Sequence, residues 1–262
     1  SASRAVSRVK PIIVLKVGRT RAGALAAASH TGAMAGEDSV YDAAFQRAGV
    51  LRVKTFEELF DCAELLAKQP KPTGPGLAII TNAGGPGVMA ADALADYGYE
   101  PATLSAETFQ KLDEILPPYW SKRNPIDMLG EAKPELYRKV VEICINAKEV
   151  NGLLIMSAPQ ALADTAEVAA ALVDLIREKP IPIITSWVGG GNMQTGRDIF
   201  NQAGIPTFDT PERAVRAFMD IYRFSKNIEM LQQIPSRFPR ELKFDRKKAK
   251  DMIQAGLETK NR

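Results

Sequence analysis

The chain has 262 residues, 45% hydrophobic and 25% charged, which is typical of a packed globular protein with one large domain or two ordinary ones. Its 34 basic and 31 acidic residues are spread through the sequence, so the net charge of +3 argues against a nucleic-acid partner. No apolar run approaches the roughly 18 residues that span a bilayer, and the N-terminus lacks a signal-peptide core. We therefore expect a cytoplasmic protein without a membrane or nucleic-acid partner.

Residues 1–70 are expected to hold only two strands. Runs of β-branched residues predict strands at 11–16 and 50–53, and helical periodicity predicts helices at 38–48 and 55–68. Two strands cannot bury both faces of a parallel sheet. We therefore interpret residues 1–70 as the C-terminal part of a domain whose beginning is missing.

Residues 69–75, QPKPTGP, have the composition of a linker and predict a domain boundary. The part that follows, residues 76–226, alternates apolar runs with amphipathic stretches. Strands are expected at 77–81, 152–156 and 181–186, and helices at 86–97, 106–116, 134–147, 164–178, 193–203 and 211–224. This order predicts a complete, doubly wound α/β domain with a parallel sheet of four or five strands.

Residues 227–262 turn basic and show no strand pattern. The basic run at 237–250 is interpreted as a solvated linker, and one amphipathic helix is expected at 249–257. We expect this region to be a linker followed by the start of another domain.

The two cysteines, Cys62 and Cys144, lie far apart in segments with helical periodicity. Neither has a second cysteine or a histidine at metal-ligand spacing. We expect both to be buried thiols in a reducing compartment, and we expect no metal site in the chain.

His30 is the only histidine in the chain, and it lies among small residues that predict a loop. Ser29, Thr31 and Gly32 flank it with hydroxyl groups and an open backbone, which suits close approach to an anion. An exposed imidazole with an ordinary pKa near 6.5 is mostly neutral at pH 7 and able to attack phosphorus. We interpret His30 as a candidate phosphoryl carrier on a mobile loop; the alternative is a loop histidine without a special role.

Residues 82–87, NAGGPG, form a glycine-rich turn between the strand at 77–81 and a helix expected to begin near Pro86. Such a turn exposes backbone N–H groups at the positive end of a helix, which favours phosphate. The candidate phosphate-binding residues are Asn82, Gly84, Gly85 and Gly87. The turn matches neither the Walker pattern nor GxGxxG, and the alternative is a turn that only lets strand and helix pack.

Two further segments follow strands or turns. The triple glycine that contains Gly190 comes after the strand at 181–186, so it is expected to share one crevice with residues 82–87. The segment NPID contains Asn124 and Asp127 and is interpreted as a structural turn. Asp127 is a weaker candidate for holding a loop near the crevice.

Four segments together resemble one family, the nucleoside-diphosphate-forming acyl-CoA synthetases. These are SHTGAMAGEDSVYDAAFQRAGVLRV at 29–53, ITNAGGPGVMAADAL at 80–94, NPIDMLG at 124–130 and AGIPTFDTPERAVRAF at 203–218. The family includes the ADP-forming acetate–CoA ligases and succinyl-CoA synthetase. The resemblance implies flavodoxin-like folds: one partial succinyl-CoA synthetase-like domain at 1–70, one complete ligase-CoA domain at 76–226, and the start of an ATP-grasp domain within 227–262.

The resemblance also implies a reaction. Family members interconvert acyl-CoA, phosphate and ADP with a carboxylic acid, CoA and ATP. The residue that matches His30 takes the phosphoryl group from an acyl phosphate and passes it to ADP, and the turn matching residues 82–87 is one of two helix N-termini that hold the phosphohistidine. The intact enzyme would therefore use CoA, Mg²⁺ and ATP or ADP. The motifs specify neither the acyl group nor the nucleotide base.

Family members also have a CoA-binding domain, a second phosphate-holding helix and a complete ATP-grasp domain. We therefore expect the chain to be a fragment that is inactive alone and binds no cofactor. Its expected partners are the missing domains or a subunit that carries them, a small carboxylic acid and phosphate, with a homodimer as a further arrangement.

Two other functions compete with the ligase. Similar domains are fused to lysine acetyltransferases, where they resemble non-catalytic sensors, although a sensor does not need a nucleophile such as His30. A flavin-binding domain is disfavoured because no aromatic residue stands beside the glycine-rich turn to stack on the isoalloxazine ring.

Overall fold

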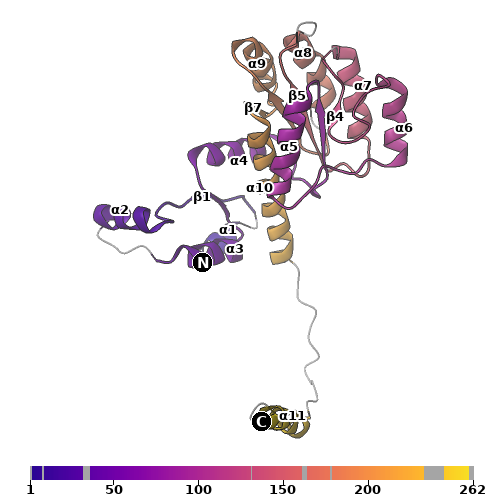
Figure 1. Cartoon of the computed structure of the whole chain (residues 1–262). Coiled ribbons are helices and arrows are strands. Elements are labelled where there is room, and N and C mark those ends of the chain that lie inside the picture. Colours follow the sequence, from indigo (N-terminus) through magenta and orange to yellow (C-terminus); the bar gives the residue numbers. More distant parts are fainter. Residues whose placement is uncertain are drawn as a thin grey trace. The chain divides into compact units, whose positions relative to one another are not determined.

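The computed structural model describes residues 2–7, 9–31, 36–130, 132–160, 164–177, 179–232 and 245–259. The chain forms two compact units, Ser1–Leu231 and Gln232–Arg262 (Figure 1). The second unit contains α11 (Arg246–Thr259). All other elements named below lie in the first unit, apart from the last residue of α10.

A five-stranded parallel sheet forms the centre of the first unit. Its strands are β3 (Leu77–Thr81), β4 (Ile126–Asp127), β5 (Gly152–Ser157), β6 (Ile183–Trp187) and β7 (Thr207–Phe208), in the spatial order β4-β3-β5-β6-β7. The first strand therefore has the second on one side and the third on the other, which is the flavodoxin-like order. This arrangement confirms the predicted α/β fold with a parallel sheet.

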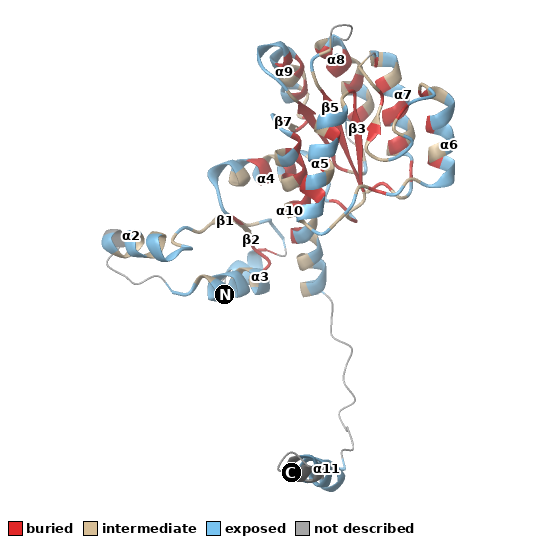
Figure 2. Ribbon diagram, in the orientation of Figure 1, coloured by how far each residue is buried: buried red, intermediate tan, exposed pale blue. Residues whose placement is uncertain are grey.

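Helices cover both faces of this sheet. They are α5 (Gly84–Asp96), α6 (Ala106–Ile115), α7 (Pro134–Ile145), α8 (Thr165–Ile176), α9 (Gln194–Gln202), which follows the short 3₁₀ helix η1 (Gly191–Met193), and α10 (Pro211–Gln232). One hydrophobic core packs α6 to α9 on one face, and a second packs α5 and α10 on the other. Every residue of β3, β5 and β6 is buried (Figure 2), as expected for a strand covered on both faces.

The first part of the chain contains α1 (Ala2–Val6), β1 (Ile13–Leu15), α2 (Arg21–Thr31), α3 (Asp38–Ala48), β2 (Leu51–Val53) and α4 (Phe56–Lys68). β1 and β2 form a separate parallel pair, so the two predicted strands are confirmed. Val53 and Leu65 belong to the same hydrophobic core as Phe218 of α10. The first part therefore packs on the larger sheet within one unit, and its division into a domain of its own stays a prediction.

Three sequence-based expectations were wrong in their local structure. Residues 21–31 form the helix α2 and not a loop, because the segment RAGALAAASHT is rich in alanine, the best helix former. The strands β4 and β7 were missed because each has only two residues, too few to show an alternating pattern. α10 continues to Gln232, well beyond the predicted end at 224.

Cys62 and Cys144 are both fully buried, as predicted. Burial raises the pKa of both thiols, that of Cys144 to about 12, so neither is a reactive thiolate at neutral pH. Within the described residues, no helix is long and apolar enough to cross a bilayer, and no three acidic, cysteine or histidine side chains are grouped to hold a metal ion.

Candidate functional site

The glycine turn, residues 82–87, joins β3 to α5 at the carboxyl edge of the sheet. The Thr81 hydroxyl accepts a hydrogen bond from Ala83 N at 3.0 Å and donates one to Ala83 O at 2.9 Å, which shapes the turn. α5 then begins at Gly84, two residues earlier than predicted, and its N-cap Ala83 makes no side-chain cap. Gly84 and Gly85 thus hold the first two helical positions, where backbone N–H groups have no partner within the helix.

The glycines of this turn divide into two kinds. A Cβ at Gly85 would meet nothing within 4 Å, and Gly84 and Gly85 are both exposed. A Cβ at Gly87 would lie 3.3 Å from both Pro125 and Thr81, and Gly87 is buried. An anion can therefore approach the N–H groups of Gly84 and Gly85, whereas Gly87 lets the helix pack against its neighbours.

The side chain of Asn82 helps to fix the glycine turn, and its predicted role in phosphate binding stays a prediction. Its side chain is buried, donates a hydrogen bond to Ala158 O at 3.0 Å and accepts one from Ala158 N at 2.9 Å. Ala158 follows β5, the neighbour of β3, so Asn82 ties together the loops at the point where the strand order reverses. Ligands of doubly wound sheets bind at this point.

Asn124 has a comparable structural role on the other side of β3. Its side chain accepts a hydrogen bond from Ile79 N and donates to Leu77 O and Ala102 O, each at 2.9 Å. These bonds fix the loop before β4 against the edge of β3. The interpretation of NPID as a structural turn agrees with this geometry.

The Asp127 carboxylate stands beside the start of α5. Its Oδ1 accepts a hydrogen bond from Leu129 N at 2.9 Å, and its Oδ2 lies 3.2 Å from where a Cβ on Gly84 would be. A negative group at this position is stabilised by the helix dipole. Asp127 therefore holds the loop after β4 and places a charge next to the exposed N–H groups.

Gly190 lies elsewhere along the sheet edge. It follows β6, and β5 separates β6 from β3. Arg197 fixes this loop by donating to Trp187 O at 2.6 Å and to Gly189 O at 2.8 Å. A crevice shared by Gly190 and the glycine turn stays a prediction.

His30 lies in the last turn of α2, together with Ser29 and Thr31, so the expected loop is wrong for these three positions. The Ser29 hydroxyl donates to Ala26 O at 2.7 Å within the helix. Gly32 and the side chains of His30 and Thr31 lie outside the described part. Figure 1 shows that α2, the helix that contains His30, lies to one side of β1 and away from α5.

A cavity of about 600 Å³ lies where the first part of the chain meets α5 and α10, and its wall includes Asp220 and Tyr97. Burial raises the pKa of Asp220 to about 6, and the nearby Glu58 adds to this rise. The Tyr97 hydroxyl, which donates to Asp220 at 3.2 Å, opposes the rise, as do the charges of Arg216 and Arg223. Asp220 is therefore a partly buried carboxyl that loses its proton at a cost.

Asp220→Asn should raise the melting temperature at pH 7.5. The folded pKa of Asp220 lies above the unfolded value, so folding binds a proton between about pH 4 and 6, and the penalty for the charged form is complete above pH 6. The asparagine removes a penalty on the order of 2 kcal/mol and keeps an acceptor for Tyr97. The gain should vanish at pH 4; thermal unfolding that shows the same gain at both pH values would contradict this account.

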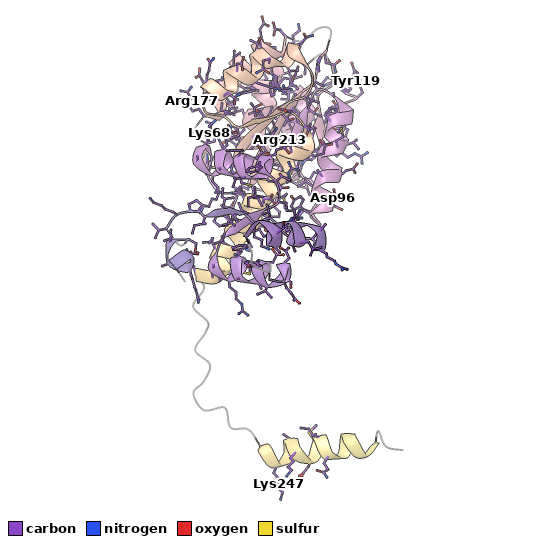
Figure 3. The ribbon with its side chains drawn as sticks, turned by 90° about the vertical axis from the view of Figure 1, so that its left-hand side faces the viewer. Lys68, Asp96, Tyr119, Arg177, Arg213 and Lys247 are labelled. Carbon is purple, nitrogen blue, oxygen red and sulfur yellow. The ribbon has the colours of Figure 1, made fainter. Side chains whose placement is uncertain are left out.

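Sequence reasoning missed the polar contacts that join α4 to α10, which involve Asp61, Glu57, Arg213 and Arg216. Arg213 lies beside the helix that carries Lys68 (Figure 3). The sequence contained a signal for these contacts. Two carboxylates lie four residues apart on α4 and two arginines lie three residues apart on α10, so each pair of like charges lies on one helix face.

Comparisons with known proteins agree with these observations. The model of the succinyl-CoA ligase like flavodoxin domain matches residues 1–66, and that of the ligase-CoA domain matches residues 77–232. The chain is 38% identical over 232 residues to the alpha subunit of ADP-forming acetate–CoA ligase I of Pyrococcus furiosus, covering 86% of this chain and 49% of the relative. It is 35% identical over 216 residues to the ADP-forming 4-hydroxybutyrate–CoA ligase of Nitrosopumilus maritimus, covering 82% of this chain and 31% of the relative.

A solved structure of a related enzyme is also similar to this chain. The dinucleotide-forming acetyl-coenzyme A synthetase 1 of Ca. Korarchaeum cryptofilum, in complex with phosphate and ADP, aligns with a TM-score of 0.83 and 33% identity, covering 90% of this chain and 51% of that chain. The chain thus spans at most about half the length of these relatives. It belongs to the ligase-CoA domain family, and its first part to the succinyl-CoA ligase like flavodoxin domain.

Proposed function

We propose that this chain is the part of an ADP-forming acyl-CoA ligase that carries a phosphoryl group on His30 and holds it at the start of α5. The observation that carries the proposal is the uncapped N-terminus of α5, with Gly84 and Gly85 exposed at the switch point of the sheet. The ADP-forming relatives and the solved relative with phosphate and ADP support it.

The proposed reaction converts acyl-CoA, phosphate and ADP to a carboxylic acid, CoA and ATP in three steps. Phosphate attacks the thioester of an acyl-CoA, which releases CoA and leaves an acyl phosphate. The unprotonated ring nitrogen of His30 then attacks phosphorus, so that the N–P bond forms as the P–O bond to the carboxylate breaks. In the last step an oxygen of ADP attacks the phosphoryl group, the N–P bond breaks, and ATP and free His30 result.

The N–H groups of Gly84 and Gly85 would stabilise the charge on the phosphoryl oxygens in the second and third steps. Since α2 and α5 lie apart, we infer that the His30 segment moves to reach the turn. The sites for CoA, Mg²⁺ and the nucleotide are proposed to lie in the regions of the relatives that this chain does not span.

Gly85→Val should weaken phosphate binding roughly tenfold or more, because it blocks the anion and removes charge-assisted hydrogen bonds. A Cβ at position 85 would meet no atom within 4 Å, so the fold should be unaffected. Gly191→Val, at another glycine without neighbours within 4 Å, is the matched control. Phosphate titration and thermal unfolding measure both effects. Equal phosphate affinities in wild type and Gly85→Val would mean that the turn only lets β3 and α5 pack and does not bind phosphate.

Asp127→Asn should strengthen phosphate binding several-fold. The substitution removes a negative charge beside Gly84, while the side-chain oxygen can still accept the hydrogen bond from Leu129 N. The gain should shrink at high salt, since the repulsion is partly screened there. Weaker binding in the same phosphate titration would show that Asp127 assists the anion and does not oppose it.

A further inference from the structure

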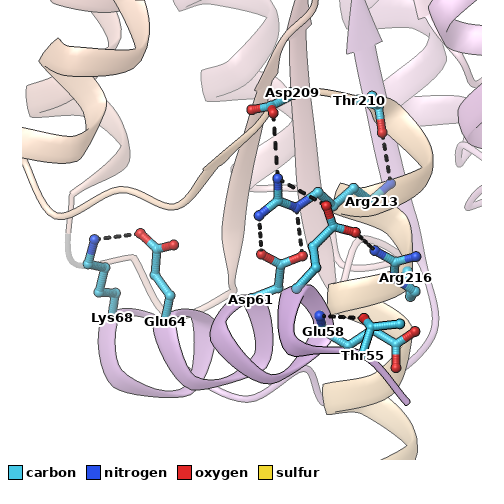
Figure 4. Close-up of polar contacts among 10 residues, drawn as sticks. Thr55, Glu58, Asp61, Glu64, Lys68, Asp209, Thr210, Arg213 and Arg216 are labelled. Atoms are coloured by element: carbon cyan, nitrogen blue, oxygen red, sulfur yellow. Dashed lines mark hydrogen bonds and ion pairs between the residues drawn. The ribbon is translucent and has the colours of Figure 1, made fainter. Parts of the chain in front are cut away.

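An ion pair on a buried carboxylate, called the buried pair below, joins the first part of the chain to the ligase-CoA domain. Arg213 of α10 donates through Nε to Asp61 Oδ2 at 2.8 Å and through Nη2 to Asp61 Oδ1 at 2.7 Å (Figure 4). The Asp61 side chain is only 4% exposed. Two parallel bonds between planar groups fix direction as well as distance.

A second, more exposed pair lies one turn earlier in α4 and one turn later in α10. Arg216 donates to Glu57 at 2.6 Å, and the Glu57 side chain is 50% exposed. It has the same charges and joins the same helices, but water screens it. Because Glu57 also lies 3.5 Å from Arg213, the substitution Arg216→Gln alone is the matched control for the buried pair.

α10 also contacts the first part near its other end. Asn227 donates to Gln46 O at 2.9 Å, and a Cβ on Gly49 would lie 2.7 Å from Ile228. Arg213 and Ile228 are separated by about 22 Å of helix at 1.5 Å per residue. The first part is thus held at two distant points along α10.

Apolar packing between these points carries little directional information. Cys62 and Leu65 sit beside Asp61 on the buried face of α4 and belong to the core that includes Phe218. Such contacts depend on the area removed from water and tolerate small rotations. Of the contacts between α4 and α10, the Asp61–Arg213 pair has the strictest geometry.

We propose that Arg213 is a positioning residue: its bidentate bond to Asp61 sets the angle between the part of the chain that carries His30 and the domain that carries the glycine turn. The functional consequence rests on the proposed phosphoryl transfer, which requires the carrier to approach the turn within a narrow range of angles. The motif at residues 203–218, which contains Arg213, then serves to orient the first part of the chain relative to the ligase-CoA domain.

The test separates orientation from stability. Spin labels at Ala44→Cys in α3 and Ala170→Cys in α8, both exposed positions, report the distance between the two parts. The native cysteines are fully buried and stay unlabelled. The double variant Asp61→Leu/Arg213→Met replaces the pair by apolar side chains of similar size, which keeps or raises stability in comparable cases.

We expect a narrow distance distribution in the wild type and one broadened by several ångström in the double variant, since a swing of roughly 10–20° moves a label about 20 Å away by that amount. Arg213→Lys keeps the charge but loses the two parallel hydrogen bonds to Asp61, so it should also broaden the distance distribution. Arg216→Gln, which leaves the partners of Arg213 in place, should keep the distribution narrow. A narrow distribution in a folded double variant would overturn the proposal.

The rate of His30 phosphorylation in the full-length protein provides the second readout. The double variant should be phosphorylated more slowly although its phosphate affinity is unchanged and its melting temperature is not lowered, which a purely stabilising pair would not produce. An unlabelled wild type would count against the proposed function, while the distance measurement would still decide the role of Arg213. A broadened distribution with a wild-type rate would overturn its functional part.

Discussion

His30→Ala should abolish phosphoryl labelling of the full-length protein by labelled ATP and Mg²⁺. The wild type should acquire one phosphoryl group that acid removes and base does not, because a phosphoramidate hydrolyses in acid. Within residues 1–262, His30 is the only imidazole that can take this role.

The substitution is a clean test because it should not harm the fold. His30 lies in the last turn of α2, where alanine is a favourable helical residue. The melting temperature should therefore stay within the error of the wild-type value. Persistent acid-labile label in His30→Ala would place the intermediate on another residue or remove it from the mechanism.

Arg213→Met alone should lower the free energy of unfolding by about 3–5 kcal/mol, because it leaves the Asp61 carboxylate buried without its partner. Arg216→Met should cost less than about 1 kcal/mol, because Glu57 is half exposed. Urea unfolding at neutral pH measures both losses. Adding Asp61→Leu to Arg213→Met should restore the lost stability in full.

Two results would contradict this account of the buried pair. Equal losses in the two single variants would mean that burial does not distinguish the pairs. A double variant as unstable as Arg213→Met would mean that the arginine stabilises the fold through other contacts, such as its longer contact of 3.5 Å with Asp209.

Most of the fold could be predicted because the central strands are long and buried on both faces. The strand at 77–81 and the helix at 38–48 have the predicted bounds, since each lies between clear turn or cap residues. β4 and β7 could not be predicted, because two-residue strands are defined by their neighbours in the sheet. α2 was missed because small residues were taken as a sign of a loop when most of them are alanine.

The sequence predicted where the site lies, but it did not predict which groups form the site or which residues pair around it. The position of the glycine turn was correct, whereas Pro86 was taken as the first helical residue and is the third. Because the helix begins two residues earlier than predicted, the N–H groups of Gly84 and Gly85 are the ones without a partner within the helix. The pairing of Asp61 with Arg213 joins residues 152 positions apart, which no local pattern encodes.

The most direct test of the central claim is to locate the phosphoryl group and follow its transfer. Trypsin should release residues 22–47 as one peptide, because no lysine or arginine lies between Arg21 and Arg47, and His30 lies within it. After incubation of the full-length protein with acetyl-CoA and labelled phosphate, we predict label on this peptide and its complete transfer to ATP when ADP is added. Label on any other peptide, or label on this one that ADP does not remove, would contradict the account.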